Sequence, residues 1–135
     1  MAAKLGLTVT LHGQFEVAIA RVTDALKAEG FGVLTEIDVR ETMKRKIGAD
    51  YAPFKILGAC NPSIAHRALT TAPEVALLLP CNVVVRQIES GRIEVSLIDP
   101  MQMISFVGKP ELKELGTEAR LRFERVVTAL RNQKT

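Results

Sequence analysis

The stretch PFKILGACNPSIAHRALTTAPEVALLLPCNVVV, residues 53–85, decides the fold of this 135-residue chain. It holds both cysteines, one of the two histidines and the most hydrophobic run of the sequence. A Cys-Asn pair occurs in it twice, as Cys60-Asn61 and as Cys81-Asn82. Each pair lies at the predicted edge of a regular element, and we expect the remaining chain to hold this stretch in place.

The first half of the stretch predicts a strand followed by a helix. Residues 54–59 form the strand, and Asn61-Pro62 marks the start of the helix. Asparagine caps a helix by accepting a hydrogen bond from an N–H of the first turn, and proline at the first helical position has no N–H to leave unpaired. We expect this helix to run to about Thr71, with His66 on the flank away from its buried stripe.

The second half predicts a hairpin. Residues 75–79 are expected to begin a strand that Pro80 interrupts, because proline cannot donate to a strand ladder. The strand resumes in the valines after Cys81 and continues to Glu89. A Ser-Gly turn then leads into residues 92–98. Their alternation of apolar and polar side chains is typical of the second strand of a hairpin, with one face exposed to solvent.

The flanking sequence supplies the remaining elements. Period-two alternation is typical of a half-buried strand, and apolar residues three or four apart are typical of an amphipathic helix. These patterns predict strands at residues 4–12 and 31–38, and helices at residues 14–28, 39–47, 101–107 and from Pro110 onward.

Five strands and several helices in mixed order, with at least one hairpin, predict an α+β fold of two layers. The helices are expected on one face of a mostly antiparallel five-stranded sheet. No linker or repeat divides the chain, so we expect a single domain over residues 1–135. The strands at residues 54–59 and 76–85 are rich in aliphatic side chains, and we therefore expect a second copy of the chain to cover part of the other sheet face.

Composition excludes several classes of protein. Hydrophobic residues make up 47% and charged residues 24%, which is ordinary for a globular protein and argues against disorder. A net charge of +3 does not reach the basic footprint of a nucleic-acid binder. The longest apolar run, Val75 to Leu79, is too short for a membrane span, and the alternating N-terminal residues do not form a signal peptide. We therefore expect a cytoplasmic protein with free thiols.

The candidate chemistry lies at the two cysteines. Cys60 precedes a capped helix start, where exposed N–H groups and the helix dipole are expected to lower the pKa of the thiol. His66, one to two turns further on, could add positive charge or act as a base. Cys81 follows a break in its strand, where side chains are often redirected toward a pocket. These placements make Cys60 and His66 candidate catalytic residues.

Each of these residues also has a structural explanation. An unpaired cysteine is often a small buried hydrophobe, Asn61 is accounted for as a helix cap, and Asn82 as a bulge residue. The two cysteines lack CxxC spacing, and a metal site built from Cys60, Cys81 and His66 has no fourth ligand that the sequence identifies. Met103 and its neighbours are expected to pack against the sheet. No nucleotide-binding, zinc-protease or serine-hydrolase motif is present in the sequence.

Five segments together resemble the bacterial and archaeal family called "domain of unknown function 302". They are GFGVLTEID at 30–38, YAPFKILGACNP at 51–62, AHRAL at 65–69, LLLPCNVVV at 77–85 and IDP at 98–100. The resemblance implies a small α+β protein near the TATA-binding-protein-like group of folds that pairs as a homodimer. It implies no DNA binding and transfers no catalytic role.

Three functions follow from these observations. The first is a cytoplasmic homodimer that binds a small molecule or a soft metal ion in a pocket lined by Cys60, Asn61, His66, Cys81 and Asn82. The second is a thiol-dependent enzyme acting on reactive sulfur or peroxide, with Cys60 as the nucleophile. The third is a structural or interaction protein that uses its bare sheet face.

Overall fold

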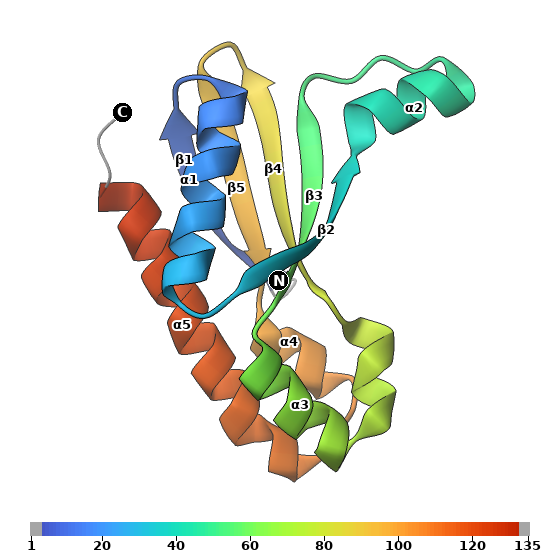
Figure 1. Ribbon diagram of the computed structural model, residues 1–135, viewed down its shortest axis with the longest axis vertical. Coiled ribbons are helices and arrows are strands. Elements are labelled where there is room, and N and C mark those ends of the chain that lie inside the picture. Colours follow the sequence, from blue (N-terminus) through green and yellow to red (C-terminus); the bar gives the residue numbers. More distant parts are fainter. Residues whose placement is uncertain (1–3, 133–135) are drawn as a thin grey trace.

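The computed structural model describes residues 4–132 of the chain. Five antiparallel strands form one open sheet in the order β1-β5-β4-β3-β2 (Figure 1). The strands are β1 (Gly6–His12), β2 (Gly32–Asp38), β3 (Phe54–Cys60), β4 (Cys81–Glu89) and β5 (Arg92–Ile98). The helices are α1 (Phe15–Ala28), α2 (Val39–Ile47), α3 (Pro62–Thr71), α4 (Pro100–Ser105) and α5 (Lys113–Asn132), with 3₁₀ helices η1 (Pro73–Leu78) and η2 (Pro110–Leu112). The predicted α+β fold with an antiparallel sheet is confirmed.

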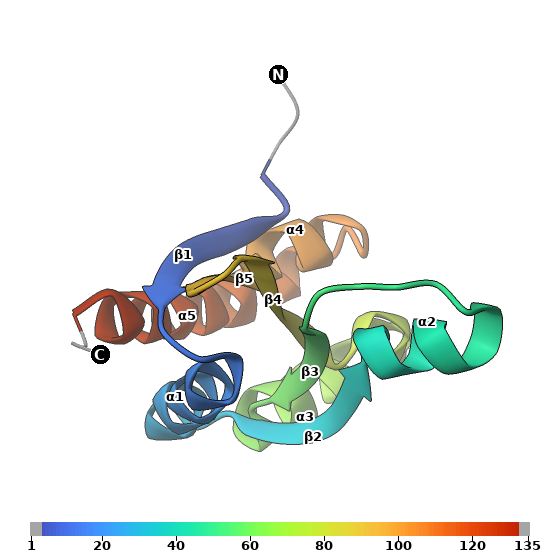
Figure 2. The same cartoon turned by 90° about the horizontal axis from the view of Figure 1, so that it is seen from above.

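Helices α1 and α5 lie together on one side of the sheet (Figure 2). The apolar sides of β1, β3, β4 and β5 face these helices and form the main core, whereas β2 contributes no fully buried residue. Within that core the rings of Phe31 and Phe123 pack with their centroids 4.6 Å apart. Side chains on the opposite sheet face, including Thr8, Thr10 and Arg86, are exposed. Buried residues of β1, β3, β4, β5, α1 and α5 build the main core, among them Val9, Leu11, Val22, Leu26, Leu57, Val83, Val85, Ile93, Val95, Leu97, Phe123, Val126 and Leu130.

A second, smaller hydrophobic cluster lies beyond one end of the sheet. It is formed by α3, η1, η2 and the first half of α5, with α4 packed beside them (Figure 1). We call this group the end cluster. Its buried residues are Ile64, Ala72, Val75, Leu112, Leu115 and Ala119. Because the second half of α5 belongs to the main core, this one helix connects the two clusters.

The predicted cap of α3 is present, and α2 is capped in the same way. The Asn61 side chain accepts a hydrogen bond from the Ile64 N–H at 3.2 Å, and Pro62 occupies the first turn of α3. Asp38 accepts from the Glu41 N–H at 2.9 Å at the start of α2. Each cap satisfies a backbone donor that has no partner within its own helix.

The prediction of a strand at residues 75–79 is wrong. Residues Pro73–Leu78 form η1, and β4 begins only at Cys81, after a cis peptide bond between Leu79 and Pro80. Proline favours the first turn of a helix, and the Val75 N–H donates to the Ala72 carbonyl at 2.9 Å to close this turn. The apolar run thus reflects burial in the end cluster, although Leu77 is 88% exposed.

Replacing Phe123 with alanine is expected to destabilise the fold by about 3–5 kcal/mol, because a fully buried aromatic ring is lost from the main core. Leu121→Ala on the exposed side of the same helix is the matched control and should change stability by about 0.5 kcal/mol or less. Urea unfolding followed by circular dichroism measures both. Equal effects of the two substitutions would contradict the assignment of the core face of α5.

Candidate ligand cavity

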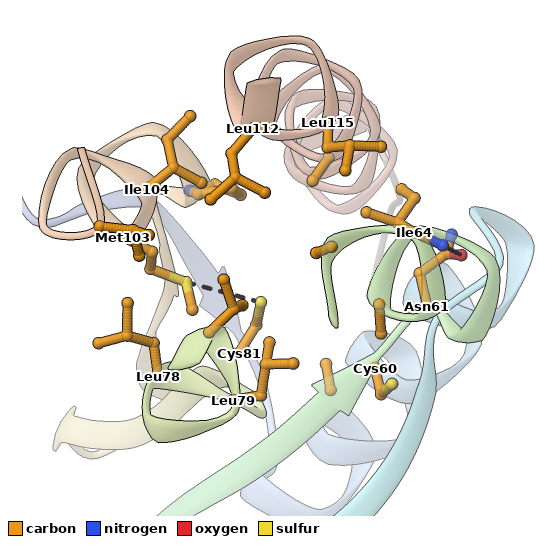
Figure 3. A pocket seen from close by; sticks show the side chains of 18 of the residues that line it. Cys60, Asn61, Ile64, Leu78, Leu79, Cys81, Met103, Ile104, Leu112 and Leu115 are labelled. Carbon is orange, nitrogen blue, oxygen red and sulfur yellow. Dashed lines mark hydrogen bonds between the residues drawn. The ribbon is translucent and has the colours of Figure 1, made fainter. Parts of the chain in front are cut away.

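An apolar cavity of about 70 Å³ lies between the end of the sheet and the end cluster (Figure 3). Strands β3 and β4 contribute Ala59, Cys60 and Cys81 to its wall, and the other walls come from helices. Among residues 4–132, no charged side chain lines it. The helical walls and the adjoining segments contribute Asn61, Ile64, Ala65, Ala68, Leu78, Leu79, Met103, Ile104, Leu112 and Leu115.

Cys81 is the first residue of β4, and its side chain lies on the same sheet face as the buried Val83 and Val85. Its Sγ atom is 3.7 Å from the Sδ atom of Met103 on α4 (Figure 3). Burial, together with negative charge on nearby Cys60, raises the pKa of the Cys81 thiol to about 11. Cys81 is therefore a protonated thiol at neutral pH.

Cys60 ends β3 and is half-buried in the wall of the same cavity. Its sulfur lies apart from the Cys81–Met103 pair (Figure 3). Burial raises the pKa of the Cys60 thiol, whereas the sequence analysis expected a lowered pKa. That expectation is wrong because burial of the sulfur outweighs any effect of the α3 N-terminus, where Pro62 has no N–H and the Ile64 N–H is bound to Asn61.

Asn61 is buried, with 9% of its surface exposed. Its side-chain oxygen caps α3, and its amide nitrogen lies against Gly30. Gly30 has a φ of 86°, and a side-chain carbon at that position would lie 3.0 Å from the amide nitrogen of Asn61. Asn61 therefore fixes the junction of β3 and α3 beside the cavity.

The other two predicted site residues lie elsewhere. His66 is exposed on α3 and borders a separate polar groove with Arg67, Glu111 and Glu114. Asn82 is exposed on β4, where strand alternation places it on the sheet face opposite Cys81. The structure thus brings Cys60, Asn61 and Cys81 to one cavity but not His66 or Asn82.

Sequence reasoning missed the contribution of α4 to this cavity. Met103 and Ile104 were expected to pack against the sheet, but they line the cavity and α4 packs on α5. Gly116 makes this packing possible, because a side-chain carbon there would lie 2.5 Å from the Cδ1 atom of Ile104. A glycine inside the long amphipathic α5 was the signal in the sequence that another element approaches closely at that point.

An ion pair beside the cavity stabilises the contact between two of its helical walls. Asp99, which precedes the lining residue Pro100, caps α4 through the Met101 N–H at 2.9 Å and forms an ion pair with Arg120 on α5. Burial of the Asp99 side chain, only 7% of which is exposed, makes this pair part of the contact between α4 and α5. Within residues 4–132, no cluster of three or more His, Cys, Asp or Glu side chains could hold a metal ion.

The fold and the cavity define a small α+β protein with an antiparallel sheet, the helices α1 and α5 on one face and an apolar cavity at the end of the sheet. The chain belongs to the family described as "Domain of unknown function DUF302", whose model matches residues 7–130.

A crystal structure of an uncharacterized conserved DUF302 protein from Bacillus stearothermophilus is similar to it, with 33% sequence identity and a TM-score of 0.86. The match covers 96% of this chain and all of that one. None of the curated proteins compared with the chain matches it. No helix within residues 4–132 is long and apolar enough to cross a membrane.

The rate of alkylation should distinguish the Cys81 thiol from an ordinary, solvent-exposed cysteine. With a pKa of about 11 in place of 9.0, Cys81 holds about 100-fold less thiolate at pH 7, since each pH unit below the pKa lowers the thiolate fraction tenfold. In a Cys60→Ser variant, which keeps the burial of Cys81 but removes the charge of Cys60, the iodoacetamide reaction of Cys81 should still be slow at pH 7 and accelerate about tenfold per pH unit until the pH reaches its raised pKa.

The same variant unfolded in urea serves as the reference for a free cysteine. Labelling of Cys81 at the unfolded rate at pH 7 would show that the thiol is neither buried nor shifted in pKa.

Proposed function

We propose that this protein binds a small, uncharged, apolar molecule in the cavity between the sheet and the end cluster. The observation that carries the proposal is the lining: aliphatic side chains, two thiols and a thioether surround the space, with Asn61 as a polar exception that is occupied as a cap. Ligand sites in proteins are typically concave and mostly apolar, and they often lie where two structural units meet.

The size of the cavity restricts what enters it. A dry cavity of about 150 Å³ accepts benzene, so a cavity of about 70 Å³ accepts only a few non-hydrogen atoms without movement of its walls. A longer molecule could place its apolar end in the cavity and leave the rest outside. Any charged group would stay outside, because the lining offers it no partner of opposite charge.

Binding is better supported than thiol catalysis. A catalytic thiol requires a lowered pKa or an adjacent base, whereas burial raises the pKa of both Cys60 and Cys81. The predicted base, His66, borders a different groove from the one that holds Cys60. A cytoplasmic location, a homodimer and the use of the open sheet face by a second copy remain part of the proposal from the sequence.

A series of 1-alkanols from propanol to octanol tests the apolar site. Each added CH₂ group should tighten binding about fourfold, from about 0.8 kcal/mol of burial, until the cavity is filled. Chemical-shift titration should show saturable changes at Ala68 and Leu115, which line the cavity.

Ala68→Leu fills part of the cavity, so the affinity should stop rising at a shorter alkanol than in the wild type. Ala129→Leu, at an exposed position of α5, should leave the dependence of affinity on chain length unchanged. The proposal fails if the cavity residues do not saturate, or if the two variants bind the series equally.

A further inference from the structure

We propose that Cys81 and Met103 form a binding site for a soft monovalent metal ion, Cu(I) or its analogue Ag(I). This site lies in the wall of the apolar cavity but does not depend on an organic molecule binding there. The donor pair differs from the Cys60, His66 and Cys81 set expected from the sequence, because His66 faces a separate groove.

The two sulfur atoms are placed to share one ion. Cys81 Sγ and Met103 Sδ face each other at 3.7 Å (Figure 3). With metal–sulfur bonds of about 2.3 Å, an ion can contact both atoms in a bent arrangement. The Met103 side chain has three rotatable bonds and can open this angle, and the adjoining cavity of about 70 Å³ leaves room for that movement.

Charge selects a monovalent ion. On binding, the Cys81 thiol releases its proton to solvent and its sulfur forms a bond to the metal: Cys81–SH plus M⁺ gives Cys81–S–M plus H⁺. One thiolate and one monovalent cation form a neutral unit, which an apolar cavity can hold. A divalent ion would leave a net positive charge beside aliphatic side chains, where burial of a charge is costly.

The chemistry of the donors favours the same ions. Thiolate and thioether sulfur are soft ligands that select Cu(I), whereas Mg²⁺ and Ca²⁺ prefer oxygen. Cys81 begins a strand of the sheet and Met103 belongs to α4. An ion held by both would therefore join α4 to the sheet, and its binding should stabilise the fold.

The test is anaerobic titration with Cu(I) against a competing chelator, followed by the ultraviolet absorbance of the copper–thiolate bond. The wild-type protein should bind one ion and release about one proton at pH 7, since the Cys81 thiol is protonated there. Met103→Leu keeps the apolar volume and should weaken binding at least about tenfold. Cys81→Ser should abolish it.

Met101→Leu is the matched control, because the Met101 sulfur accepts from the Thr117 hydroxyl at 3.7 Å and does not line the cavity. It and Cys60→Ser should bind as the wild type does. Wild-type affinity in Met103→Leu would overturn the proposal, as would loss of binding in Cys60→Ser, which would place the ion between the two cysteines. Circular dichroism confirms that each variant is folded. The alkanol titration is carried out without metal, so the metal-site proposal and the apolar-ligand proposal are tested independently.

Discussion

Helix α5 supplies apolar side chains to both hydrophobic clusters, and α3, α4 and η2 all pack against it. Its second half places Phe123, Val126 and Leu130 against the sheet, and its first half places Leu115 and Ala119 in the end cluster. A helix cannot bend sharply without a break in its hydrogen bonding. The sheet and the end cluster are therefore held at a fixed distance, and the cavity is the space that side chains between them leave unfilled.

The sequence was sufficient for the elements whose signals are local. Period-two alternation located β1 and β5, and the Asn61-Pro62 pair located the start of α3, because caps and turns depend on a few neighbouring residues. Residues 75–79 were misassigned because a short apolar run has no period of its own. Burial in a helical cluster and burial in a sheet select the same side chains there.

The candidate site was only partly predictable for a related reason. Cys60 and Cys81 reach one cavity because Ala59 and Cys81 are paired in neighbouring strands, and strand ends that are paired stay close. The pKa of Cys60 was mispredicted, since the occupied cap of α3 and the burial of the sulfur are properties of the folded chain. Likewise, Met103 could not be assigned to the cavity before the packing of α4 on α5 was known.

The apolar lining gives the cavity its chemical character. The burial that keeps the Cys81 thiol protonated makes it a poor nucleophile toward polar reagents. The same burial adds no free-energy cost to contact between the neutral thiol and apolar groups. The same surroundings leave sulfur as the principal donor for an incoming ion. A neutral, buried thiol is better suited to packing against apolar groups than to nucleophilic catalysis.

Gly116 allows α4 to lie close against α5, because a side-chain carbon there would displace the Ile104 side chain. The width of the cavity therefore depends on a single helix position that itself lines the cavity. A substitution at Gly116 would thus change the width of the cavity while the rest of its lining stays the same.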